Sequence, residues 1–89
     1  MGKVEAFGLE GVKCWFCSSD HRPPHFHAKR RGQWCFRVLF MLSKDRMLVR
    51  VKGLRGSINA RDREMLCGLA EKHREELVQE WERKVNCHD

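Results

Sequence analysis

The sequence lacks several features that would assign it to a large class of proteins. Its longest apolar run, Val38–Leu42, is too short to span a bilayer, and it shows no secretory leader. Its five cysteines are odd in number and irregularly spaced, unlike a disulfide framework. It also has no repeat, low-complexity stretch or linker. We therefore expect a single domain over residues 1–89, in the cytoplasm, with reduced thiols and no membrane association.

Acidic residues are almost absent from the middle of the chain. Residues 22–55 contain ten Lys or Arg and a single acid, Asp45, which gives this segment a net charge of +9. Residues 61–89 contain six basic and eight acidic residues, so the net charge of +6 comes from the first two-thirds of the chain. A one-sided basic field attracts polyanions or an acidic partner protein. A charged face that serves only solubility is the alternative.

The first half of the chain alternates between apolar and polar residues, as short strands do. Five strands are expected between about residues 3 and 52, at 3–7, 12–17, 25–30, 33–40 and 47–52. Alternation assigns one face to the core, with the side chains of Phe26, Ala28, Trp34, Phe36, Val38, Phe40, Met47, Val49 and Val51. The opposite face then carries His25, His27, Lys29, Cys35, Arg37, Arg50 and Lys52. A slip of one residue in register would exchange the two faces.

The period of the apolar residues becomes helical after Ala60. Asn59 is suited to be the N-cap, and Asp62 in the first turn suits the helix dipole. One unbroken helix would be roughly 40 Å long, which exceeds the width of a domain of this size. We therefore expect two helices, at about 59–72 and 74–86, with a break near 72–74. The predicted fold is α+β: a small, mostly antiparallel sheet of about five strands, followed by two C-terminal helices packed on one face.

The run Asp20-His21-Arg22-Pro23-Pro24-His25-Phe26-His27 resembles the signature of DUF4160, a family of small bacterial proteins of unknown function. The second half agrees as well, with Gly56, the span 61–69, and His73-Arg74-Glu75-Glu76-Leu77 followed by Trp81. The resemblance covers roughly residues 5–83. It implies a place in a toxin–antitoxin pair, because members of this family often occur in genomes beside a second small protein. The sequence departs from the family at Cys14, Cys17, Leu69 and Asn59-Ala60, and none of these touches the histidine motif.

The histidines of this motif are the candidate catalytic residues. His25 and His27 alternate with Phe26, so their imidazoles are expected to share a sheet face and could act as general base and general acid in RNA cleavage through the 2′-hydroxyl. Lys29 would stabilise the charged phosphorane, and Asp20 would orient one ring by accepting its N–H. Two alternatives remain open: the histidines contact a ligand or metal, or they only join the loop to the sheet.

We expect no cofactor and no metal. Cys14-x-x-Cys17 has a spacing known from zinc sites, but Trp15 and Phe16 between the cysteines favour a strand. Positions i and i+3 of a strand point to opposite faces, so neither zinc nor a disulfide is expected to join the two thiols. A site formed by His21, His25 and His27 is the remaining metal alternative.

Basic residues near the motif are the candidate contacts for a nucleic acid or an acidic partner protein. They are Arg22, Lys29, Arg30, Arg37, Arg50 and Lys52. An exposed Trp15 or Phe16 beside them would stack a base, unless the helices or a dimer partner cover it. The leading interpretation is a toxin-like RNA-binding protein or metal-independent ribonuclease. The alternatives are a non-enzymatic module that docks an acidic partner, and a small metalloprotein with histidine ligands. A homodimer is compatible with each.

Overall fold

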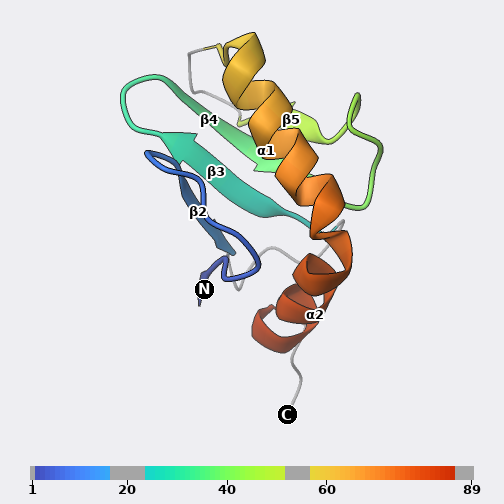
Figure 1. The fold of residues 1–89 in the computed structure, drawn as a ribbon. Helices are drawn as coiled ribbons and strands as arrows, with labels where there is room; N and C mark the ends of the chain where they lie inside the picture. The colour runs from blue at the N-terminus through green and yellow to red at the C-terminus, as the bar shows by residue number, and fades with distance from the viewer. Residues whose placement is uncertain (1, 17–23, 52–56, 86–89) are drawn as a thin grey trace.

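The computed structural model describes residues 2–16, 24–51 and 57–85 (Figure 1). The elements in chain order are β1 (Gly2–Lys3), β2 (Lys13–Phe16), β3 (Phe26–Arg30), β4 (Trp34–Val38), β5 (Leu48–Arg50), α1 (Ala60–Lys72) and α2 (Arg74–Lys84). The strands form one antiparallel sheet in the order β1-β2-β3-β4-β5, so each strand pairs with its neighbours in the sequence. The predicted α+β fold is confirmed. Within the described residues, no helix is long and apolar enough to cross a membrane.

The core lies between one face of the sheet and the helices. Phe26 is fully buried at its centre, with its ring edge-on to Phe16 at 6.4 Å and stacked on Phe40 at 6.1 Å between centroids. Leu66 of α1 and Leu77 of α2 are fully buried from the helical side. The core face predicted from alternation in β3 and β4 is therefore confirmed by burial of Phe26, Ala28, Trp34, Phe36, Val38 and Phe40.

The helices begin and break where the sequence predicts. The Asn59 side chain accepts a 2.7 Å hydrogen bond from the Asp62 N–H and so caps α1. α1 ends at Lys72, and the N–H of His73, its C-cap, donates to the Leu69 carbonyl at 2.9 Å. Arg74 then starts α2, and its guanidinium donates to the carbonyls of Phe40 (2.7 Å) and Leu42 (2.9 Å). The helix break is therefore tied to the connection between β4 and β5.

The first strand is shorter than predicted. Only Gly2 and Lys3 form β1, although the sequence predicts a strand from residue 3 to residue 7. The chain leaves the sheet because the Glu5 N–H donates to Glu80 of α2 at 2.8 Å rather than to a strand. The Phe7 ring lies edge-on to Phe26, with centroids 5.7 Å apart. This segment therefore joins the sheet to the helices instead of extending the sheet edge.

The register predicted for the last strand is wrong. Val49 pairs with Arg37, on the face away from the helices, and Arg50 pairs with Phe36 on the helical side. Val49 is accordingly 37% exposed. The sequence Met47-Leu48-Val49 is apolar at three consecutive positions, so it fits either register, and pairing with β4 decides between them. Met47 is buried, as predicted.

Candidate functional site

One face of the sheet packs against the helices, and the opposite face, which we call the open face, does not (Figure 1). Residues that pair directly across neighbouring strands point to the same side of a sheet. The register therefore gives the open face a row that consists of Lys3, Trp15, His27, Arg37 and Val49. A second row consists of Lys13, Lys29 and Cys35. The predicted placement of His27, Lys29, Cys35 and Arg37 opposite the core face is confirmed.

Three aromatic rings cluster on the open face. The Trp15 and His27 rings are stacked, with centroids 5.3 Å apart and an interplanar angle of 17°. The His25 ring is edge-on to His27, also at 5.3 Å and at 75°. The two histidines therefore share a face, as their spacing around Phe26 predicts. Their exposure differs: His27 is partly exposed, whereas His25 is 6% exposed.

Cations surround this cluster. Lys3, Lys13 and Lys29 are exposed and Arg37 is partly buried. Within the described parts of the chain, no carboxylate forms an ion pair with any of these four. The Arg37 Nε–H is buried and has no hydrogen-bond acceptor among the described residues. A buried donor normally has an acceptor, so an anion on this face would satisfy it.

On the helical side of the sheet, by contrast, the cation Arg30 is paired with a carboxylate. Arg30 donates from Nε to Asp62 of α1 at 2.8 Å and from Nη2 at 3.2 Å, and the Trp34 indole N–H donates to the same carboxylate at 3.2 Å. Desolvation raises the pKa of Asp62, but the hydrogen bonds from Trp34, Arg30 and Asn59 and the Arg30 charge outweigh it and hold the pKa below its ordinary value. Arg30 therefore acts in the fold, between β3 and α1.

The structure places the described members of the predicted binding set on both sides of the sheet. Lys29 and Arg37 lie on the open face, and Arg30 and Arg50 lie on the helical side of the sheet. Arg30 lies there because it alternates with Lys29, and Arg50 because of the register of β5, which differs from the predicted one. The other predicted residues, Asp20, His21, Arg22 and Lys52, lie outside the described residues.

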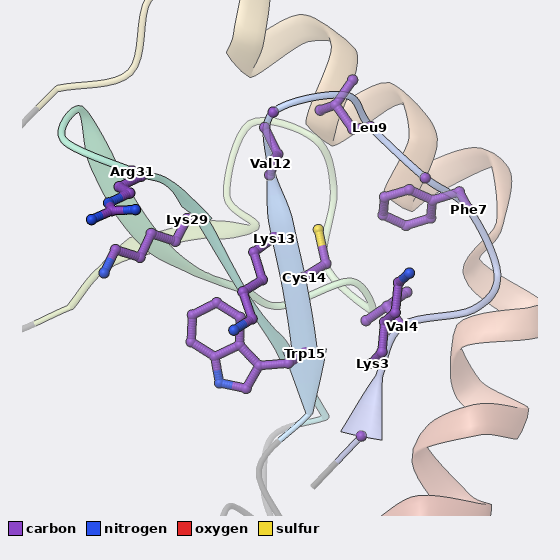
Figure 2. A pocket seen from close by; sticks show the side chains of 13 residues that line it. Lys3, Val4, Phe7, Leu9, Val12, Lys13, Cys14, Trp15, Lys29 and Arg31 are labelled. Carbon is purple, nitrogen blue, oxygen red and sulfur yellow. The ribbon is translucent and has the colours of Figure 1, made fainter.

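Sequence reasoning missed three basic residues near the site. Lys3 and Lys13 belong to the two rows of the open face, and Arg31 follows β3 in the turn before β4. Lys13 alternates with Cys14 and lies two residues before Trp15, so the alternation in residues 12–17 was sufficient to predict that Lys13 and Trp15 share a face. Figure 2 shows Lys13, Trp15, Lys29 and Arg31 on the same side of β2.

The described cysteines are free thiols. Cys14 lies in β2 and is buried towards the core, and burial raises its pKa to about 12. Burial also raises the pKa of Cys35 on the open face, although the charge of Lys29 opposes this. Cys17, the other half of the predicted non-bonded pair, lies outside the described residues. Among the residues that the structure describes, no group of three or more His, Cys, Asp or Glu side chains could hold a metal ion.

Comparison with known proteins places the chain in a family. The sequence model of the family described as "Domain of unknown function (DUF4160)" matches residues 11–82. This match runs from β2 into α2 and therefore includes the central strands of the open face, all of α1 and most of α2. No significant match to a curated protein or to a solved structure was found. The chain belongs to the DUF4160 family.

Proposed function

We propose that this protein binds single-stranded RNA on the open face of its sheet. The observation that carries the proposal is Trp15, which is stacked on His27 and has Lys13 and Lys29 in the adjacent row. Aromatic rings that stack bases, set among cations that contact phosphates, are how sheets hold single strands. The lysines lack carboxylate partners in the described structure, so their charge is available to a polyanion.

The size of the open face suits a short footprint. Trp15 and His27 lie on neighbouring central strands, and Arg37 continues the row onto β4. Neighbouring strands are about 4.8 Å apart, so these three side chains extend over about 10 Å. Sheets that bind RNA in this way stack two or three bases. A duplex keeps its bases stacked on each other, so a single strand is the form that this face fits.

Fluorescence anisotropy with a labelled eight-nucleotide single-stranded RNA tests the proposal. Trp15→Ala should weaken binding by about 5- to 150-fold, because one base–aromatic stack contributes about 1–3 kcal/mol. Trp15→Phe keeps an aromatic ring and should retain most of the affinity. Unaltered thermal unfolding of the variants is the control for folding. Equal affinity of wild type and Trp15→Ala would contradict the proposal, and a parallel titration with DNA tests the preference for RNA.

Metal-independent cleavage of the bound RNA is the second part of the proposal. It is favoured by the contact between the His25 and His27 rings, with Lys29 two residues further along the same face. His25 is buried, so a phosphodiester would meet His27 first. His27→Phe preserves a ring beside Trp15 and removes the titratable group. It should retain RNA binding and lower cleavage by about a hundredfold or more, the effect of one lost acid–base group. Absence of cleavage by the wild-type protein in EDTA would remove this part.

The cellular setting in the proposal follows from the family resemblance. A toxin-type protein would act in the bacterial cytoplasm and arrest growth when expressed without its partner. The alternative is a non-enzymatic module whose lysines dock an acidic partner protein. Wild-type protein that fails to bind RNA, yet binds the product of the neighbouring gene in a salt-dependent way, would favour that alternative.

A further inference from the structure

A groove of about 1070 Å³ opens at the sheet edge formed by β2 (Figure 2). It exists because the chain leaves β2 after Val4 and returns to it only at Val12, whose N–H donates to the Leu9 carbonyl at 3.0 Å. The intervening segment forms an arch with Phe7 on its inner side (Figure 2), and Leu9 of the same segment also lines the groove. Phe7, Leu9 and Val12 are all partly exposed, so the groove has a wall of accessible apolar side chains.

The charged side chains of this groove are all cationic. Lys3, Lys13, Lys29 and Arg31 reach it, and Figure 2 shows the last three on the side of β2 away from Phe7 and Leu9. The only other side-chain donors in the described lining are the Trp15 indole N–H and the buried thiol of Cys14. The described lining contains no hydroxyl, amide, imidazole or carboxylate side chain. These side chains therefore offer hydrogen-bond donors and positive charge, but no strong acceptor.

We propose that this groove binds a small amphiphilic anion that crosses the edge of β2, with an apolar chain against Phe7, Leu9 and Val12 on one side and a carboxylate or phosphate head against Lys13, Lys29 and Arg31 on the other. A head group of this kind only accepts hydrogen bonds, so the cations satisfy all of its oxygens. A nucleobase or a sugar also carries donors, for which the groove's side chains supply no strong acceptor. The ligand class is therefore a single-chain acyl carboxylate or alkyl phosphate.

A second cavity of about 440 Å³, beside α1, differs from the groove in the hydrogen-bonding groups of its lining. Its lining includes Glu10, Gln33, Asn59, Arg61 and Asp62, so donors and acceptors are mixed there. A ligand with an acceptor-only head has no preference for that cavity. It serves as the internal comparison for the groove, because both lie next to the turn at Gly8 and Leu9.

The groove for the amphiphilic anion is a second binding site beside the RNA site proposed on the open face, and the two sites overlap. Lys13, Trp15 and Lys29 belong both to the open face and to the groove, so the two ligands are expected to compete. Leu9 belongs to the groove and lies outside the two open-face rows. Failure of one proposal is therefore distinguishable from failure of the other.

Titration of the ¹⁵N-labelled full chain with decanoate and with decyl phosphate, below their micelle concentrations, tests the proposal. Saturable shifts are expected for the amides of Gly8, Leu9, Gly11 and Val12. Shortening the chain from decanoate to octanoate should weaken binding about fourfold for each buried methylene lost. Decan-1-ol and inorganic phosphate, which each carry half of the ligand, should bind much more weakly. Equal binding of decan-1-ol, or affinity independent of chain length, would overturn the proposal.

Two variants confine the effect to the groove. Leu9→Asp puts a carboxylate into the apolar wall and should abolish decanoate binding while RNA binding persists. Arg31→Glu, at an exposed turn position, should weaken decanoate binding at least tenfold, and Arg61→Glu on α1 is the matched charge control. If Arg61→Glu weakens binding as much as Arg31→Glu, the groove is not the site. Vesicles of anionic phospholipid separate a free ligand from a membrane: binding to vesicles without decanoate shifts would also overturn the proposal.

Discussion

Removal of two open-face cations should change how RNA binding depends on salt. Four described cations, Lys3, Lys13, Lys29 and Arg37, lie on this face without carboxylate partners. If each neutralises one phosphate of a single strand, log K should fall with log salt at a slope of about −2.8. Raising the salt from 50 to 200 mM would then weaken binding by about 50-fold. In the double variant Lys29→Ala/Arg37→Ala the slope should be about −1.4, and the same change in salt should weaken binding only about sevenfold.

A matched variant separates the open face from net charge. Arg61→Ala/Arg83→Ala removes two exposed cations from the helices and therefore changes the net charge by the same amount. Anisotropy titrations of both double variants at four salt concentrations give the slopes. The helix variant should keep the wild-type slope. Equal loss of slope in the two variants, or a wild-type slope near zero, would refute the assignment of the phosphate contacts to the open face.

Three further predictions concern the fold and its titratable groups. Gly11→Ala should lower the free energy of unfolding by about 1–2 kcal/mol, because Gly11 has φ +79°. The added Cβ would also lie 2.5 Å from a guanidinium nitrogen of Arg30, whereas at Gly32 (φ +77°) it would meet no atom within 4 Å. Thermal unfolding should therefore show the larger loss at Gly11, and equal losses would contradict the role of that contact. Asp62 has a lowered pKa, so its contribution to stability should be present above pH 3.8, its ordinary pKa, and be lost as the pH falls through the lower folded value. Urea unfolding of Asp62→Asn should lack this acid-dependent loss of stability. Parallel dependence of stability on pH in the wild type and in Asp62→Asn would refute the prediction. Cys14, with a pKa of about 12, should be alkylated far more slowly at pH 8 than Cys35. Mass spectrometry of the modified peptides measures the two rates. Equal rates would show that the Cys14 thiol is accessible.

Alternation along the chain was sufficient to predict the core face of the two central strands. In β3 and β4, apolar residues alternate with polar residues or cysteine from Phe26 to Lys29 and from Trp34 to Val38, so only one register buries the aromatic rings. The same rule placed His27 and Arg37 together on the open face. The start of α1 at Asn59 could also be predicted, because its capping hydrogen bond joins residues only three positions apart in the sequence.

Contacts between distant parts of the chain could not be predicted in this way. β1 ends early because Glu5 bonds to Glu80, which is 75 residues away in the sequence. Arg30 alternates with Lys29 and so falls on the helical side, where Asp62 neutralises it. The stacking of Trp15 on His27 depends on the register between β2 and β3, which the composition of either strand alone does not determine. The sequence thus predicted the residue types of the site, and long-range pairing selected among them.

The most direct test of the central claim is a map of the RNA contacts on the folded protein. Titration of the ¹⁵N-labelled chain with a short single-stranded RNA should shift the Trp15 indole N–H and the amides of Lys13, His27 and Lys29, and leave α1 and α2 unchanged. Those signals report on the open face and on the opposite side of the molecule, respectively. Shifts concentrated in α1 and α2, with Trp15 unaffected at saturation, would contradict RNA binding on the open face.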